Sequence, residues 1–129
     1  MISLDAEKAF DKLWRNGLFF KLKNKLDKRD WLILKKYFDS STAEIICNGE
    51  VSNAFKVVTG VKKGGVLSPF LFNVYIDELV EGTVNLNVGA IIGNTKTNLI
   101  SYCDDINLLF SSPKHGQVML NKCNEFAEK

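Results

Sequence analysis

The stretch Tyr102-Cys103-Asp104-Asp105 places two adjacent carboxylates between apolar runs, Leu99-Ile100 before them and Ile106 to Phe110 after them. Two short β-type runs that meet at a polar pair predict a tight β-hairpin with the carboxylates at its tip. Carboxylates a few ångströms apart repel each other, and a divalent cation removes that cost. Hard oxygen ligands of this kind suit Mg²⁺ or Mn²⁺, which makes the pair a candidate metal site that works alongside substrate phosphates.

The orientation of the two carboxylates depends on the pleat of the strands. Neighbouring strand residues point to opposite faces of a sheet, so at most one of Asp104 and Asp105 shares a face with Tyr102, unless the turn rotates it. The dipeptide alone fits an ordinary solvated turn equally well, because Asp is a common turn residue. The choice between these two interpretations depends on the rest of the chain.

The elements that must position these carboxylates begin at the N-terminus. Ile2 to Asp5 is typical of a short strand that ends in an acid. Ala6 to Leu26 then has a helical pattern, with an expected break or bend at Gly17-Leu18. A second helix, from about Trp31 to Phe38, is predicted to end at the turn residues Asp39-Ser40-Ser41.

Several β-type runs follow, and the first two are joined by Asn48-Gly49, the strongest hairpin signal in the sequence. The runs are Ala43 to Cys47, Val51 to Val58, Val88 to Ile92, Asn98 to Cys103 and Ile106 to Ser111. The last two are the strands of the carboxylate hairpin.

Two Ser-Pro pairs predict the starts of two further helices. Gly60 to Leu67 is a glycine-rich loop, after which Ser68 is predicted to be the N-cap and Pro69 the first residue of a helix that runs to about Glu81. Its expected apolar face is Phe72, Tyr75, Ile76 and Leu79. Ser112-Pro113 predicts the start of a last helix, with Met119, Cys123 and Phe126 on one side.

This order of elements predicts an α+β fold in which an antiparallel sheet carries helices on one face. Asp5 closes the first strand and Asp104 ends another. If these strands are neighbours, the two carboxylates converge at one edge of the sheet. No repeat or linker divides the chain, so a single unit is expected.

Composition narrows the class of protein. The 129 residues are 46% hydrophobic and 25% charged, which is typical of a globular domain. Three cysteines without a CxxC or Cys/His spacing disfavour zinc and a disulfide framework. No apolar run approaches the ~20 residues of a membrane span, and no signal-peptide pattern opens the chain, so neither a membrane partner nor secretion is expected. Ten of the seventeen Lys and Arg residues lie between Lys8 and Lys36, either as the footprint of a nucleic acid or as solvated helix faces.

Three segments resemble motifs A, B and C of the reverse transcriptase palm. They are Leu4-Asp5-Ala6-Glu7-Lys8-Ala9-Phe10-Asp11, Gly60-Val61-Lys62-Lys63-Gly64-Gly65-Val66-Leu67-Ser68-Pro69-Phe70-Leu71-Phe72-Asn73 and Tyr102-Cys103-Asp104-Asp105. The likeness is to LINE-type (non-LTR) retrotransposons, whose motif A ends in Lys-Ala-Phe-Asp and whose motif B contains Gly-Val-x-x-Gly-x-x-Leu-Ser-Pro. The resemblance implies a palm fold with a metal site at a β-hairpin tip, and the activity of an RNA-directed DNA polymerase.

The resemblance also implies roles for individual residues. Asp5, Asp104 and Asp105 would be the catalytic carboxylates and would bind two Mg²⁺ ions, with Mn²⁺ as a substitute, beside the backbone carbonyl of Ala6. Two such ions lie ~3.5–4 Å apart and act on the attacking primer 3′-hydroxyl and the pyrophosphate leaving group. The implied substrate contacts are Ala6, Phe10, Lys63, Gly64 and Tyr102. Among them, Phe10 would lie under the incoming sugar and exclude a 2′-hydroxyl.

Two positions depart from the family pattern. Lys63 stands where Gln is usual, and Cys103 departs mildly from the common Ala or Met, whereas Lys62 stands where Pro, Arg or Lys is more often found. A Lys meets a phosphate as a point charge but offers no amide acceptor, so contacts made through the usual Gln are not expected here.

The resemblance implies an RNA template, a DNA primer and deoxynucleoside triphosphates as partners, and an intracellular, nuclear location. The fingers strands, the primer grip and the thumb have no counterpart in these residues. We therefore expect a partial reverse transcriptase domain over residues 1–129 that is inactive when isolated. The alternative is a catalytically inactive relic or a domesticated palm that binds only RNA or protein. Lys63 favours this alternative, and the three intact acids argue against it. A calcium loop is disfavoured because no D-x-D-x-D-G pattern surrounds Asp104.

Overall fold

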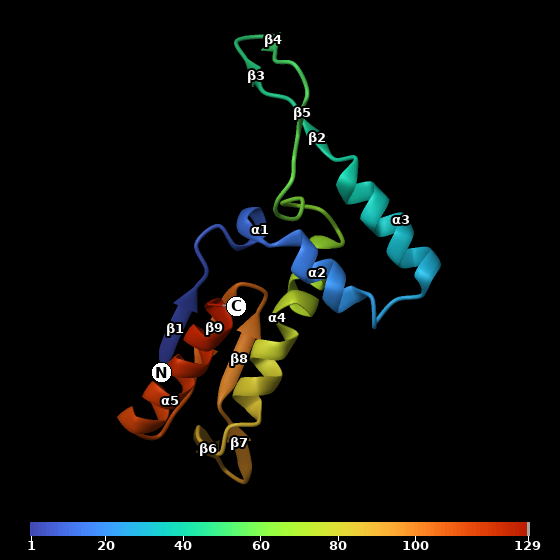
Figure 1. The fold of residues 1–129 in the computed structure, drawn as a ribbon. Helices are drawn as coiled ribbons and strands as arrows, with labels where there is room; N and C mark the ends of the chain where they lie inside the picture. Colours follow the sequence, from blue (N-terminus) through green and yellow to red (C-terminus); the bar gives the residue numbers. More distant parts are fainter. Residues whose placement is uncertain (129) are drawn as a thin grey trace. The chain divides into compact units, whose positions relative to one another are not determined.

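The computed structural model describes residues 1–128. The chain divides into two compact units, one formed by Met1–Lys8 with Tyr75–Lys129 and the other by Ala9–Val74. Two units stand in place of the single expected unit, because the contacts of the chain cluster around two centres. Figure 1 traces the chain through both, and each unit is described by itself.

The first unit contains a three-stranded antiparallel sheet in the order β1-β9-β8. Its strands are β1 (Ile2–Asp5), β8 (Leu99–Tyr102) and β9 (Asp105–Leu108). In β9, polar and apolar residues alternate, and the apolar Ile106 and Leu108 are buried. The predicted first strand and the carboxylate hairpin are both confirmed, and the first strand pairs directly with the hairpin (Figure 1).

A second hairpin precedes the sheet; its first strand falls within the predicted run Val88 to Ile92, and its second strand was not predicted. It pairs β6 (Ala90–Ile92) with β7 (Thr95–Thr97) around Gly93, whose φ is +61°. The polar run Thr95-Lys96-Thr97 has no apolar alternation, so hydrophobic periodicity does not detect it.

Helix α5 (Pro113–Ala127) begins as the sequence predicts, because Ser112 is its N-cap and accepts a hydrogen bond from the His115 amide. Within this unit α5 packs on the second half of α4 (Ser68–Val84), where the rings of Tyr75 and Phe126 lie 6.2 Å apart in an edge-on contact. The sheet face that carries Asp5 is exposed, and the opposite face carries the buried Ile106 and Leu108. The predicted α+β class, a mixture of helices and antiparallel strands, is confirmed, and the packing of the helices on one face of the sheet stays a prediction.

The second unit contains the helices α1 (Ala9–Lys12), α2 (Arg15–Leu22) and α3 (Lys28–Asp39), and also the first turns of α4. Helices α2 and α3 pack through the buried ring of Phe19, which lies 6.0 Å from Trp31 and 5.8 Å from Phe38. The indole N–H of Trp31 also donates a hydrogen bond to the backbone carbonyl of Phe19, which joins the same two helices. The predicted second helix and its end near Ser40 are confirmed.

The predicted break at Gly17-Leu18 is wrong. The helical pattern divides at Leu13-Trp14, and Gly17 lies inside α2. A Cβ on Gly17 would come within 2.4 Å of the Trp14 ring, so this glycine makes room for an indole and does not bend the helix. The carbonyls of Phe10 and Leu13 accept hydrogen bonds from Val61 and Gly60, which occupies two backbone acceptors near the break.

The hairpin between α3 and the glycine-rich loop forms around Asn48-Gly49, as predicted. Both residues have positive φ, +50° and +85°, as a type I′ turn requires. Its strands are shorter than the two predicted runs because the pairing is interrupted. They are β2 (Thr42–Ala43), β3 (Ile46–Cys47), β4 (Glu50–Val51) and β5 (Phe55–Lys56).

The three cysteines are free thiols, with Cys47 exposed, Cys103 buried and Cys123 half-buried. In the described part of the chain, no helix combines the length and the apolar character that crossing a membrane requires.

Candidate active site

The register of the sheet places two of the three predicted carboxylates side by side. Asp5, the last residue of β1, lies directly opposite Asp105 on β9, and Asp105 lies opposite Tyr102 on β8. Residues directly opposite each other in an antiparallel sheet point to the same face. Two positions along that face, the Ser3 hydroxyl donates to the amide oxygen of Asn107 at 2.6 Å. Asp105, and not Asp104, therefore shares a face with Asp5 and Tyr102.

Asp104 lies in the two-residue turn that joins β8 to β9. Cys103, the first turn residue, has φ of +52°, and a positive φ at this position alone is the pattern of a type II′ turn. Glycine is the usual residue there, because a side chain in the left-handed region is strained. The strained Cys103 is buried, and Asp104 is half-buried beside it.

Over the residues that the structure describes, the carboxylate end of the sheet has no compensating charge. Within residues 1–128, no ion pair or side-chain hydrogen bond involves Asp5, Asp104 or Asp105. Burial raises the pKa of the Cys103 thiol, and the charges of Asp104 and Asp105 raise it further. Like charges directly opposite in a sheet are destabilising, and a bound cation would remove that cost.

The predicted metal site is not assembled in this structure. Over the described residues, no group of three or more His, Cys, Asp or Glu side chains stands ready to hold a metal ion. The sheet register brings Asp5 and Asp105 onto one face, whereas Asp104 belongs to the turn. The donor set nevertheless fits Mg²⁺, because the hard carboxylate groups of Asp5 and Asp105 share one face of the sheet and have no cationic partner within residues 1–128. The metal site stays a prediction.

Motif B begins at Gly60, where only glycine fits. Its φ is +73°, and a Cβ would lie 2.5 Å from the carbonyl oxygen of Asp11 and 2.6 Å from that of Phe10. The amide of Gly60 donates to Leu13 at 2.9 Å, and that of Val61 donates to Phe10 at 2.7 Å. The loop is thus tied by its backbone to the region of α1.

The other end of the loop is held by Ser68, and the predicted N-cap role of this residue is wrong. Helix α4 begins at Ser68 itself, with the Leu67 carbonyl accepting the first helical bond from Leu71. The buried Ser68 hydroxyl donates to the carbonyl of Lys62, which also accepts the Gly65 amide. Ser68 therefore closes the loop, and Lys62, Lys63 and Gly64 are exposed between the two fixed ends.

Phe10 is half-buried, and its ring lies 5.2 Å from that of Phe72 at an angle of 31°. Both belong to the second unit, whereas Asp5 and Ala6 belong to the first. The contact with Phe72 gives Phe10 a packing role. Its predicted contact with the incoming sugar stays a prediction.

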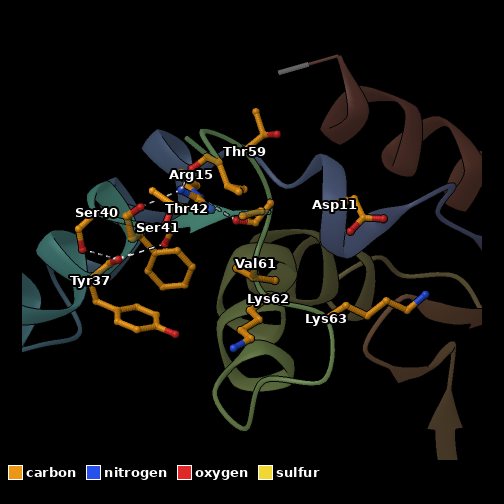
Figure 2. A pocket seen from close by; sticks show the side chains of 14 residues that line it. Asp11, Arg15, Tyr37, Ser40, Ser41, Thr42, Thr59, Val61, Lys62 and Lys63 are labelled. Atoms are coloured by element: carbon orange, nitrogen blue, oxygen red, sulfur yellow. Dashed lines mark hydrogen bonds between the residues drawn. The ribbon is translucent and has the colours of Figure 1, made fainter. Parts of the chain in front are cut away.

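A cavity of about 560 Å³ lies between the end of α3 and the motif B loop. Figure 2 shows Tyr37 and Lys62 pointing into the same space from opposite sides. Its charged lining consists of three cations and one acid, namely Arg15, Lys62, Lys63 and Asp11. This balance favours an anionic occupant.

Comparison with known proteins identifies the family. The model of the family "Reverse transcriptase (RNA-dependent DNA polymerase)" matches residues 1–129. The chain belongs to the reverse transcriptase family.

The relatives of this reverse transcriptase chain come from mobile elements. It is 32% identical over 126 residues to the Pol polyprotein of the type-2 retrotransposable element R2DM of Drosophila melanogaster, covering 96% of this chain and 12% of the relative. It is 30% identical over 126 residues to the probable RNA-directed DNA polymerase from transposon BS of the same species, covering 98% and 13%. Against the RNA-directed DNA polymerase from mobile element jockey, identity is 28% over 109 residues, covering 84% and 12%. The resemblance to non-LTR retrotransposons is confirmed, and the chain spans about an eighth of these relatives.

Sequence reasoning misassigned one residue that holds the reverse transcriptase motifs in place and missed another. Ser68 was predicted to be the N-cap of the helix, whereas it is the first residue of α4 and its hydroxyl donates to the loop carbonyl of Lys62. Arg15 was counted among the ten basic residues of the N-terminal half, but its guanidinium is half-buried and bonded to backbone. The available signal for Arg15 was its type, since the sequence contains only two arginines among seventeen basic residues.

Proposed function

We propose that this chain supplies the palm of an RNA-directed DNA polymerase of a non-LTR retrotransposon. The observation that carries the proposal is the direct pairing of Asp5 with Asp105, next to the turn with Asp104 and without a compensating charge among the described residues. Such an uncompensated group of acids is unfavourable for folding, and it suits a site that receives cations with a nucleotide.

In this proposal Asp5, Asp104 and Asp105, with the carbonyl of Ala6, hold two Mg²⁺ ions, and Mn²⁺ is a substitute. When bound, the ions would assist the attack of the primer 3′-hydroxyl and the departure of pyrophosphate. The carboxylates themselves act by position, since phosphoryl transfer depends mainly on alignment and charge neutralisation. The strand end of β1 and the turn after β8 provide this alignment.

Motif B contributes binding. Its loop, fixed at Gly60 and at Ser68, presents Lys62 and Lys63 to solvent. These ammonium groups would contact phosphates of the template or primer as point charges. The proposed partners are an RNA template, a DNA primer and deoxynucleoside triphosphates, and the proposed location is the nucleus. The names of the relatives support a polymerase, and the alternative of a binding-only relic receives no support from them.

Binding of Mn²⁺, followed by its electron paramagnetic resonance signal, tests the site. We expect Asp5→Asn and Asp104→Asn to weaken Mn²⁺ binding at least tenfold. Asp30→Asn on α3, an exposed acid in the other unit, is the matched control and should bind as the wild type does. Equal affinity in all variants would contradict the metal assignment.

Two assays test nucleic-acid binding and polymerase activity. The first is filter binding of a labelled RNA template with an annealed DNA primer, with and without Mg²⁺. The second is a primer-extension assay on the whole protein. Extension that is lost in Asp104→Asn supports a polymerase. Magnesium-independent binding without extension would support the binding-only alternative.

A further inference from the structure

Arg15, the first residue of α2, joins three distant segments of the second unit. Its guanidinium donates from Nε to the carbonyl of Gly60 at 2.7 Å, and from Nη1 to those of Phe38 at 2.9 Å and Val57 at 2.6 Å. The acceptors lie 45, 23 and 42 residues away along the chain. They belong to the motif B loop, the last turn of α3 and the segment after β5.

The environment of Arg15 suits a guanidinium and no other cation. Its Cζ lies 5.0 Å from the centroid of the Phe38 ring, and burial lowers its pKa, partly offset by the charge of Asp39. Backbone carbonyls replace the water that burial removes. The three acceptors match the planar fork of donors in arginine, whereas a lysine ammonium on a flexible stem does not span them in the same way.

Arg15 acts on the peptide that opens motif B. The N–H of Gly60 donates to the Leu13 carbonyl, and the carbonyl of Gly60 accepts a hydrogen bond from Arg15. The next amide, of Val61, donates to Phe10. A glycine adopts positive and negative φ with similar ease, so its sequence alone does not fix the backbone at Gly60. These hydrogen bonds select the conformation with positive φ.

We propose that Arg15 is a positioning residue that sets the conformation of the motif B loop and thereby places Lys62 and Lys63 for nucleic acid. The proposal rests on the proposed function for its link to nucleic acid. Its structural part concerns only the second unit.

Amide hydrogen exchange of the 129-residue chain tests the structural part. In Arg15→Lys, which keeps the charge, the amides of Gly60 and Val61 should exchange at least tenfold faster than in the wild type. Two reference amides should keep their rates, Leu18 in α2 and Leu109 in the first unit, which donate to Trp14 and Asn98. Arg29→Lys, at the only other arginine, is the matched control and should change none of these rates.

Binding of a labelled single-stranded RNA, measured by fluorescence anisotropy, tests the functional part. Arg15→Lys should weaken binding at least fivefold although the net charge is unchanged, and Arg29→Lys should bind as the wild type does. If the wild-type chain fails to bind RNA, the proposed function loses its nucleic-acid contact, while the exchange experiment still decides the role of Arg15.

Chemical rescue separates positioning from a general effect on stability. In Arg15→Ala, added ethylguanidinium at sub-denaturing concentration should restore slow exchange at Gly60 and Val61, and ethylammonium should not. Unchanged exchange at Gly60 in Arg15→Lys would overturn the proposal. A uniform acceleration at all four amides would also overturn it, because Arg15 would then support the whole fold.

Discussion

The carboxylate end of the sheet and the motif B loop differ in whether their polar groups have partners. In the loop, the carbonyls of Gly60 and Lys62 and the hydroxyl of Ser68 all have hydrogen-bond partners. At the carboxylate end, Asp5 faces Asp105 without a compensating charge in the described residues. The loop is thus built for one fixed backbone conformation, and the sheet end carries a repulsion that a ligand would relieve. This difference predicts that substitutions in the loop cost stability and that substitutions of the acids do not.

The largest effect is expected at Gly60. In Gly60→Ala the new Cβ would meet two backbone carbonyl oxygens at 2.5 and 2.6 Å, in a backbone conformation that L-residues rarely adopt. Left-handed strain of about 1–2 kcal/mol and overpacking of about 1–3 kcal/mol predict a loss of about 3 kcal/mol in the free energy of unfolding. Urea denaturation measures it.

The control for this prediction lies in the same loop. Gly64 also has a positive φ, +76°, but a Cβ there would meet nothing within 4 Å. Gly64→Ala should therefore cost only the backbone strain, about 1–2 kcal/mol. If the two substitutions cost the same, the contacts of Gly60 with Asp11 and Phe10 do not constrain the loop.

The second effect concerns Phe10, which has both a packing contact and a predicted role in substrate choice. In the active whole protein, Phe10→Val should raise ribonucleotide incorporation relative to deoxyribonucleotide about tenfold, or about 1.4 kcal/mol in relative transition-state binding. The reason is that a Phe ring fills the space of a 2′-hydroxyl and offers it no hydrogen bond. Primer extension with competing nucleotides measures the ratio.

Phe10→Val also removes part of the contact with Phe72, so thermal melting must accompany the assay. Phe72→Leu weakens the same contact without touching Phe10. It should leave sugar selectivity unchanged. A protein that folds with unchanged selectivity in Phe10→Val would show that Phe10 only packs.

Most elements were predictable because their signals are local. The Asn48-Gly49 turn, the Ser112 cap and the alternation in β9 each depend on a few consecutive residues. The second strand of the hairpin at Gly93 was not predictable, because backbone pairing of the polar run Thr95-Lys96-Thr97 leaves no hydrophobic pattern. The break at Leu13-Trp14 was missed because Gly17 serves the Trp14 ring, a tertiary contact.

The candidate site was predictable in its residue types and less so in its geometry. The acids could be named from the motif, and the pairing of β1 with the carboxylate hairpin followed from the expected convergence. Which acid lies opposite Asp5 depends on the strand register, because a shift by one residue moves every side chain of the strand to the other face of the sheet. The assignment of Asp105 to that face therefore required the structure, as did the hydrogen bonds of Arg15 to residues 23 to 45 positions away.

The third effect tests the repulsion directly. Without metal, Asp105→Asn should leave the fold equally stable or stabilise it by about 0.5 kcal/mol, because a like-charge pair directly opposite in the sheet is removed. Asp104→Asn should also not destabilise the metal-free fold, and both variants should abolish activity in the whole protein. Thermal melting in EDTA at low and high salt measures the difference, which salt should reduce. A clear loss of stability in either variant would reveal a structural partner for that carboxylate and break the contrast with the loop.

The smallest effect is the reactivity of the cysteines, which reports how closed the carboxylate turn is. Cys47 is exposed, whereas burial raises the pKa of both the Cys103 and the Cys123 thiols, with Asp104 and Asp105 adding to the effect at Cys103. A raised pKa lowers the thiolate fraction at pH 8, so iodoacetamide should modify Cys47 first and the other two several-fold more slowly. Raising the pH should narrow the difference, since the hindered thiols then ionise. Mass spectrometry of timed samples gives the order, and Cys47→Ser should remove only the fast phase. If Cys103 instead reacted as fast as Cys47, the turn would open readily in solution, and the strained conformation at Cys103 would not hold the carboxylates in place.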